Sequence, residues 1–210
     1  EGGEFKAVVT QMGRSDVSVR VGEHNKIERE LNRRVHLWSG ITANERMDWL
    51  LEKATELGAT TLLPIIAERS VLKLKGDRAD KKLAHWQAIA VASSEQCGRN
   101  RVLQVCSPAT LSQAIAQISA PALQAARWVL SLAPGTRSLQ EMMQTLKTSK
   151  DESTSKTREI ILLSGPEGGL SPAEEAQAIA AGFVPVSLGN RVLRAETAPV
   201  AVLSALSCWD

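Results

Sequence analysis

The sequence predicts an α/β fold with a mainly parallel β-sheet, because short apolar runs alternate along the chain with segments of helical periodicity. The apolar runs predict strands at residues 35–38, 61–66, 102–106, 128–132, 160–163 and 184–188. The segments between them predict helices at residues 47–57, 83–97, 111–118, 139–146, 173–181 and 198–206. Alternation of this kind is typical of βαβ units, in which helices cover both faces of a parallel sheet.

Signals at the ends of these segments support the same interpretation. Asn44 suits the N-cap of the first helix, and Gly58 and Gly98 follow the ends of the first two helices. The polar, low-complexity run at residues 147–158 predicts a surface loop.

The N-terminal residues follow a different pattern. From Glu4 to Val21 apolar and polar residues alternate on both sides of a turn at residues 13–16, which predicts a β-hairpin. Because two strands alone are marginal in water, we expect the hairpin to belong to a small β domain whose remainder lies upstream. The charged stretch at residues 24–34 predicts a linker or a short exposed helix. We therefore expect two parts, residues 1–30 and residues 31–210.

Composition narrows the function classes. The chain carries 25 Lys and Arg against 23 Asp and Glu, and this net charge of +2 by itself indicates no partner. No apolar run approaches the roughly 18 residues of a membrane-spanning helix. The three Cys and three His are scattered, so neither a disulfide framework nor a metal site is predicted. The shortage of aromatic residues, with no Tyr, argues against an RNA-binding sheet that stacks bases. No signal-peptide pattern is visible, which fits a cytoplasmic protein.

The most informative residues follow three of the predicted strands. They are the LAPG string at 132–135, the GPEGGLSP string at 165–172 and the SLGNRVLRAETA string at 187–198. Because ligands of parallel sheets gather at the carboxyl ends of the strands, these loops predict a shared binding site. The first string is also compatible with an ordinary turn.

The second loop is rich in glycine, which lets a backbone approach a ligand closely. It lacks the Lys-Ser/Thr of a phosphate loop, and the chain has no GxGxxG fingerprint. Glu167 suits a ligand with hydroxyls or a cationic centre. Ser171 as N-cap, Pro172 at the first helical position and Glu174 in a capping box predict that a helix begins here. The alternative is a tight strand-to-helix turn without a ligand.

The third loop combines apolar and charged residues. Val192 and Leu193 could wall an adenine while backbone groups read its edge. Arg194 could contact a phosphate or stabilise a developing anion. Glu196 could take part in chemistry, or it could only favour the N-terminus of the last helix.

Basic residues are concentrated between residues 67 and 101. Eight Lys or Arg stand there against four acidic residues, whereas the whole chain has a surplus of only two. Such a strip can neutralise nucleic-acid phosphates, although a solvated helix face would look the same.

The strings LLSGPEGGLSPAE and SLGNRVLRAETA resemble those of the bacterial small-subunit ribosomal RNA uridine-N3 methyltransferases, the RsmE family, which belongs to the SPOUT class of knotted methyltransferases. The strings EKATELG at 52–58 and SEQCGR at 94–99 extend the resemblance, which covers most of residues 35–206. Family members carry a PUA-like β-barrel upstream, of which only the last hairpin is apparent in residues 1–30.

The resemblance implies a deep trefoil knot near the C-terminus, a homodimer, and S-adenosylmethionine (SAM) as cofactor, with no metal. Its substrate would be one uridine of small-subunit (16S) ribosomal RNA, within the small ribosomal subunit. By position, the cofactor would contact Leu132, Ala133, Gly165, Glu167, Gly168, Leu188, Gly189, Val192, Leu193 and Thr197. Arg194 would stabilise the uridine anion, and Glu196 or Glu167 would accept the N3 proton. RNA phosphates would contact Arg69, Lys73, Arg99 and Arg101.

Three other functions remain compatible with the residues. The first is a SPOUT methyltransferase that acts on another RNA, such as a tRNA ribose. The second is a non-enzymatic RNA-binding or ribosome-assembly module with a vestigial pocket. The third is a metabolic α/β enzyme, which the absence of a catalytic His or Cys constellation disfavours.

Overall fold

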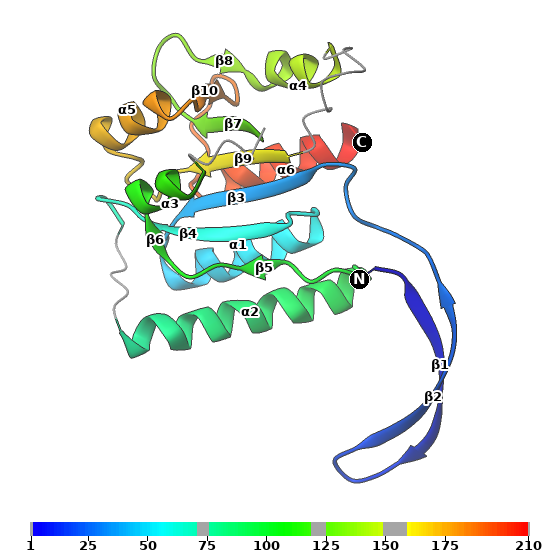
Figure 1. Ribbon diagram of the computed structural model, residues 1–210. Helices are drawn as coiled ribbons and strands as arrows, with labels where there is room; N and C mark the ends of the chain where they lie inside the picture. The colour runs from blue at the N-terminus through cyan, green and yellow to red at the C-terminus, as the bar shows by residue number, and fades with distance from the viewer. Residues whose placement is uncertain (1, 71–75, 119–124, 149–158, 210) are drawn as a thin grey trace.

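The computed structural model describes residues 2–70, 76–118, 125–148 and 159–209. Its main body is a β-sheet in which every paired neighbour runs parallel, in the order β5-β4-β3-β9-β7-β10-β8, with β6 paired to β4 (Figure 1). The strands are β3 (Arg34–Gly40), β4 (Thr61–Ile66), β5 (Gln104–Val105), β6 (Ala109–Thr110), β7 (Ala125–Leu130), β8 (Arg137–Ser138), β9 (Glu159–Ser164) and β10 (Val184–Ser187). The predicted mainly parallel α/β fold is therefore confirmed.

Helices cover both faces of this sheet, and two apolar clusters make up the core. The helices are α1 (Asn44–Glu56), α2 (Asp77–Cys97), α3 (Leu111–Ile118), α4 (Leu139–Thr148), α5 (Pro172–Ala180) and α6 (Thr197–Trp209). One cluster contains residues of α1, α2, α4 and α6, and the other contains residues of α3 and α5. The sheet separates them because alternate residues of a strand point to opposite faces: Leu162 of β9 belongs to the first cluster and Leu163 to the second.

Most predicted elements are confirmed, and the differences have local causes. The predicted strand at 102–106 shrinks to β5, and the two-residue strands β6 and β8 were not predicted. Helix α2 begins at Asp77, before the predicted start at residue 83. The prediction missed these first turns because they are charged and lack apolar periodicity. The predicted N-cap Asn44 is wrong: Ala43 occupies that position, without a side-chain cap. Residues 149–158 of the predicted surface loop lie outside the described residues.

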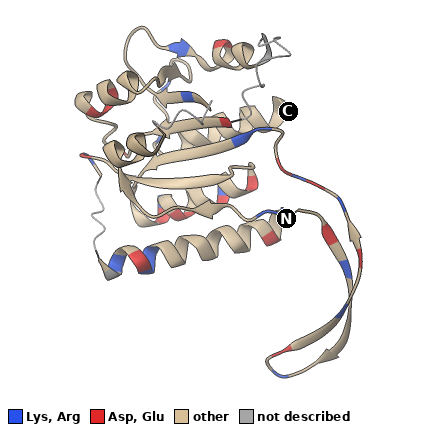
Figure 2. Cartoon of the chain, viewed as in Figure 1, with Lys and Arg blue, Asp and Glu red and all other residues tan. Residues whose placement is uncertain are grey.

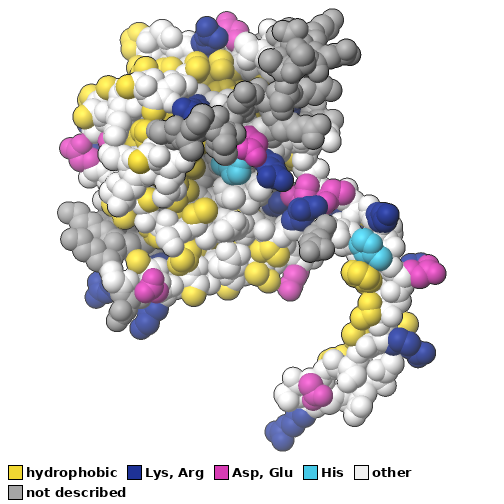
Figure 3. All heavy atoms as spheres, viewed as in Figure 1, with side chains coloured by type: hydrophobic (Ala, Val, Ile, Leu, Met, Phe, Trp, Pro, Cys, Tyr) yellow, Lys and Arg dark blue, Asp and Glu magenta, His cyan; other side chains and the backbone are white. Residues whose placement is uncertain are grey.

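The N-terminal hairpin is confirmed and extends away from the sheet (Figure 1). It consists of β1 (Glu4–Met12) and β2 (Val17–Asn25), which pair antiparallel. Its apolar side chains are exposed, as Figure 3 shows, and Phe5, Val9 and Val19 are each about half accessible to solvent. Residues 26–33 form neither helix nor strand, so the short helix that was one alternative for this stretch is absent, and the linker stays a prediction.

Candidate functional site

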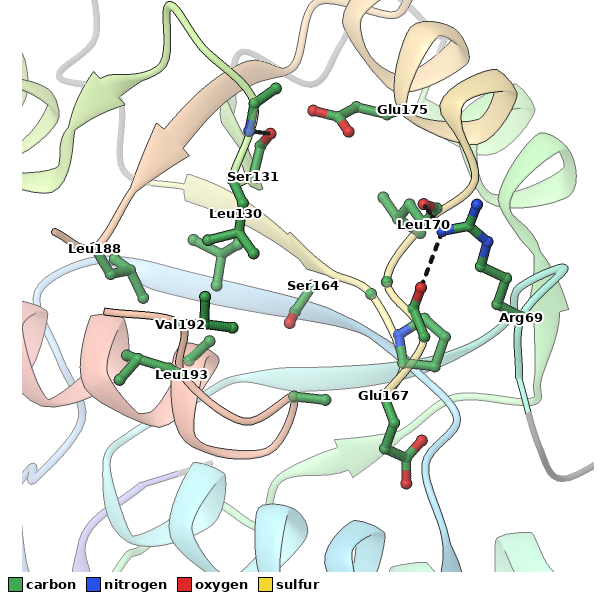
Figure 4. A pocket seen from close by; sticks show the side chains of 18 of the residues that line it. Arg69, Leu130, Ser131, Ser164, Glu167, Leu170, Glu175, Leu188, Val192 and Leu193 are labelled. Atoms are coloured by element: carbon green, nitrogen blue, oxygen red, sulfur yellow. Dashed lines mark hydrogen bonds between the residues drawn. The ribbon is translucent and has the colours of Figure 1, made fainter. Parts of the chain in front are cut away.

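A cavity of about 400 Å³ lies at the carboxyl ends of β7, β9 and β10 (Figure 4). The loops that follow these strands form its walls, so the structure brings together the three strings singled out in the sequence. Eight of the ten residues proposed for the cofactor line it: Leu132, Ala133, Gly165, Glu167, Gly168, Leu188, Val192 and Leu193. Gly189 lines a neighbouring depression, and Thr197 is the first residue of α6.

The wall beyond β7 and β10 is apolar and open to solvent. Leu132 exposes 70% of its surface and Val192 exposes 77%, although both side chains are large and apolar. Leu130, Leu188 and Leu193 continue this surface into the cavity (Figure 4). An apolar wall with a few polar groups at its edge is typical of small-molecule sites.

The opposite wall is the GPEGG loop, residues 165–169, which is held in a tight conformation. A Cβ atom on Gly165 would lie 2.7 Å from the nitrogen of Leu170, so only glycine fits there. The predicted capping box is confirmed: Ser171 Oγ accepts a hydrogen bond from the nitrogen of Glu174, and Glu174 Oε2 accepts one from the nitrogen of Ser171. The loop therefore presents backbone rather than side chains to a ligand.

Arg69 fixes this loop from the neighbouring segment after β4. Its Nη1 donates to the carbonyl oxygens of Gly168, at 3.1 Å, and Leu170, at 3.4 Å (Figure 4). The backbone nitrogen of Glu68 donates to Glu174 Oε1 at 2.9 Å. Arg69 was expected to contact RNA phosphates, but the structure gives its guanidinium a place in the cavity wall.

The side chain of Glu167 points away from the middle of the cavity (Figure 4). Its Oε1 accepts hydrogen bonds from the backbone nitrogen of Ala43, at 2.8 Å, and from Nη1 of Arg46, at 3.3 Å. Glu167 thus binds the backbone N–H of the N-cap residue from a distant loop, the contact that an N3 side chain makes in a capping box. The cavity meets the backbone of Glu167, and its carboxylate serves the contact with α1.

The two residues proposed for catalysis have different environments. Arg194 is exposed, and its guanidinium has no hydrogen-bond or ion-pair partner among the described residues, while its carbonyl oxygen accepts from the nitrogens of Thr197 and Ala198. Glu196 is buried, and its Oε1 lies 3.8 Å from Nε of Arg46. Neither belongs to the cavity lining.

The other three residues that were expected to contact RNA phosphates are not all available for that role. Lys73 lies outside the described residues. The side chain of Arg99 is only 5% exposed and binds the carboxylate of Glu30 and the carbonyl oxygens of Thr55 and Ala59. The expectation that Arg99 contacts phosphates is therefore withdrawn, because its donors are used inside the protein. Arg101 pairs with Glu28 at 3.0 Å, and this contact lowers the pKa of the Glu28 carboxyl.

Sequence reasoning missed several residues at the site. Arg46 was not selected, since nothing in its local sequence indicates that it meets Glu167 and Glu196. Ser131, Glu175 and Arg191 also line the cavity, and Figure 4 shows the Glu175 carboxylate on its rim opposite Ser131. The position of Glu175 in the first turn of α5, directly after the GPEGG loop, could have identified it.

The described residues show neither a metal site nor a membrane-spanning helix. Within the described residues, no group of three or more His, Cys, Asp or Glu could hold a metal ion. The same part of the chain contains no helix that is long and apolar enough to cross a membrane.

Comparisons with known proteins identify the family of this chain. A family model for the RNA methyltransferase domain matches residues 29–207. Ribosomal RNA small subunit methyltransferase E of Bacillus subtilis (strain 168) is 32% identical over 207 residues, which cover 99% of this chain and 78% of that protein.

Two solved structures are similar to this chain in fold as well as in sequence. A putative methyltransferase from Legionella pneumophila in complex with bound SAM superposes with a TM-score of 0.85 at 30% identity, over 100% of this chain and 80% of that one. Ribosomal RNA small subunit methyltransferase E from Neisseria gonorrhoeae, bound to SAM, gives a TM-score of 0.81 at 30% identity over 97% and 77%. The chain therefore belongs to the RNA methyltransferase domain family.

Proposed function

We propose that this protein uses SAM to methylate N3 of a uridine in small-subunit ribosomal RNA. The observation that carries the proposal is the cavity at the carboxyl ends of β7, β9 and β10, because two of its three loops, those after β9 and β10, come from strings that resemble the RsmE family. The names of the relatives from Bacillus subtilis and Neisseria gonorrhoeae support the RNA substrate, and the bound SAM in two structural relatives supports the cofactor.

The cavity suits the chemistry of SAM. The exposed Leu132 and Val192 and the half-buried Leu193 offer an apolar surface to an adenine ring, which removes that surface from water. Backbone groups of the GPEGG loop lie opposite, unobstructed by side chains. The carboxylate of Glu175 on the rim can accept hydrogen bonds from hydroxyls or an ammonium group.

When bound, SAM supplies a methyl group that leaves sulfur as the bond to uridine N3 forms. N3 carries a proton in neutral uridine, so this proton must leave for the nitrogen to act as a nucleophile. The protein can hold the base in line and stabilise the anion, and the exposed guanidinium of Arg194 is available for that role. Glu196 is the carboxylate proposed to accept the proton, directly or through water.

The finer architecture is also a proposal. We infer that residues 188–196 take part in a trefoil knot with the GPEGG region, and that the protein is a homodimer. Both inferences rest on the resemblance to SPOUT methyltransferases. Residues 1–30 are proposed to be the C-terminal part of a PUA-like RNA-binding domain plus linker, and residues 31–210 the methyltransferase domain. A ribosomal RNA substrate implies a cytoplasmic location.

The RNA surface is proposed to include the start of α2. Arg78, Lys81 and Lys82 lie there, Arg78 and Lys81 exposed and Lys82 half-buried, and none of them has an ion-pair partner among the described residues (Figure 2). They belong to the basic strip found in the sequence and replace Arg69 and Arg99 as its best candidates. Arg101 remains a proposed RNA contact at the other end of α2.

Titrating SAM into the protein in a calorimeter separates this function from the non-enzymatic alternative. We expect saturable heat with one SAM bound per protein chain, whereas a vestigial pocket would give no heat. Incubation with labelled SAM and either small ribosomal subunits or tRNA then separates the two enzymatic functions. Label that enters tRNA and not small subunits would contradict the proposed substrate.

A further inference from the structure

Arg46 lies between two acidic side chains that come from two different loops of the site. Its Nη1 is 3.3 Å from Oε1 of Glu167, and its Nε is 3.8 Å from Oε1 of Glu196. Glu167 belongs to the GPEGG loop after β9, and Glu196 directly precedes α6. One guanidinium in the first turn of α1 therefore bridges two segments that are distant in sequence.

The two carboxylates depend on this cation. The side chains of Glu167 and Glu196 are only 21% and 11% exposed, and the Oε2 atom of each is buried without a hydrogen-bond partner among the described residues. A carboxylate taken out of water is costly unless a cation or hydrogen bonds compensate it. Without Arg46, the buried carboxylate of Glu196 would lose its cation, and Glu167 would keep only its hydrogen bond from the nitrogen of Ala43.

The bridge is anchored on a rigid element. Met47, Leu50 and Leu51 of α1 are fully buried in the core, which fixes the position of the helix. Glu167 also accepts a hydrogen bond from the nitrogen of Ala43 at the start of α1, where the helix dipole favours a carboxylate. The GPEGG loop is thus held by two contacts with α1, and the loop that ends at Glu196 is held through Arg46.

We propose that Arg46 is a positioning residue that joins the two cofactor loops. By pairing with Glu167 and Glu196 together, it keeps residues 188–196 close to the GPEGG loop, so that Val192 and Leu193 remain on the cavity wall. Arg46 itself is absent from the cavity lining, so it acts on the cofactor through these loops. This inference rests on the proposed function, because it assigns SAM to the cavity.

The first test compares SAM affinity in three variants by calorimetry. Arg46→Gln is expected to raise the Kd for SAM by about 5- to 150-fold, the range of typical coupling energies between sites. Arg46→Lys is expected to recover part of the affinity, because an ammonium group can reach one carboxylate but cannot bridge both. Arg137→Gln is the matched control, since Arg137 is exposed on β8 and has no ion-pair partner in the part of the chain that the structure describes. This variant is expected to leave the Kd unchanged.

The second test asks whether Arg46 acts through Glu196. If it does, the double variant Arg46→Gln/Glu196→Gln binds SAM no more weakly than Arg46→Gln alone. The double variant is also expected to melt at a higher temperature than Arg46→Gln, because Glu196→Gln removes a buried charge that no longer has a partner.

Each outcome decides the inference. An unchanged Kd in folded Arg46→Gln overturns it, as does a normal Kd for SAM with a raised KM for RNA, which would make Arg46 an RNA contact. If Arg46→Gln does not fold, Glu196→Gln alone carries the test, and wild-type SAM affinity in that variant overturns the inference. If the wild-type protein itself gives no heat with SAM, the proposed function fails, and the melting temperatures of the single and double variants still decide whether the bridge exists.

Discussion

Arg69 donates a hydrogen bond to the carbonyl oxygen of Gly168 at 3.1 Å, and so ties the segment after β4 to the GPEGG loop. The same guanidinium reaches the carbonyl oxygen of Leu170 at 3.4 Å. A residue that the charge count places on an RNA surface thus forms part of the proposed cofactor pocket.

Replacing Arg69 with Ala is expected to weaken SAM binding about fivefold, which corresponds to removing about 1 kcal/mol of loop stabilisation. The expected effect is modest because Arg69 is exposed and water can replace part of the interaction. Calorimetric titration of SAM measures the change. Glu68→Ala is the control, since Glu68 contributes its backbone nitrogen and not its side chain; an equal weakening in both variants would contradict a specific role for Arg69.

The buried ion pair between Arg99 and Glu30 predicts a large effect on stability. Replacing Arg99 with Met leaves the carboxylate of Glu30 without its partner and frees the carbonyl oxygens of Thr55 and Ala59. We expect the free energy of unfolding to fall by about 3 kcal/mol. Urea denaturation measures it, and Arg101→Met, which breaks an exposed ion pair, is expected to lower the free energy of unfolding much less. Equal decreases in the free energy of unfolding would show that the contribution of these ion pairs to stability does not depend on burial.

His36 predicts a pH dependence of stability. Burial lowers the pKa of its imidazole, against an opposing effect of Glu159, and Nε2 is buried without a hydrogen-bond partner among the described residues. Because the folded-state pKa lies below the unfolded value of about 6.5, the unfolded chain binds the proton more readily. The stability that comes from keeping His36 neutral is therefore fully present above about pH 6.5, and it is lost as the pH falls towards the pKa in the folded state.

The matching measurement is the free energy of unfolding at pH 7.5 and at pH 5.5. Wild-type protein is expected to lose more stability between these values than His36→Gln, by at most about 1.4 kcal/mol per pH unit. The charged groups that face His36 are Glu159 and Arg34. If the free energy of unfolding changes equally with pH in the two proteins, the pH dependence belongs to residues other than His36.

The basic start of α2 predicts salt-dependent binding of small subunits. Replacing Arg78, Lys81 and Lys82 with Gln is expected to lower the affinity and to reduce the slope of log K against log salt by roughly 0.7–0.9 for each phosphate that the protein no longer neutralises. Filter binding at several salt concentrations gives both quantities. The Kd for SAM is expected to stay at its wild-type value, and an unchanged salt slope would place the RNA elsewhere.

Sequence periodicity predicted the elements that are long enough to show it. The strand at 61–66 and the helix at 111–118 were predicted to the residue, because each has a clear apolar pattern with distinct flanks. The two-residue strands β6 and β8 span a single repeat of the two-residue strand pattern, so the sequence could not reveal them.

Contacts between distant segments account for the other differences. Glu167, which is 124 residues away from Ala43, accepts a hydrogen bond from the backbone nitrogen of this N-cap residue, and no local pattern in the sequence reveals the contact. Likewise, a count of basic residues cannot tell a solvated guanidinium, as at Arg78, from one buried against carbonyl oxygens, as at Arg99. The loops of the site were predictable from their positions after apolar strands, whereas the ion pairs that hold them are products of the fold.

The most direct test of the proposed function is mass spectrometry of nucleosides from small-subunit ribosomal RNA. Small subunits lacking the modification are incubated with the protein and SAM, then digested. The proposal predicts that 3-methyluridine appears, and that it stays near background with an Arg194→Ala variant that still binds SAM. Subunits that gain no 3-methyluridine, or that gain a ribose methyl group instead, would contradict it.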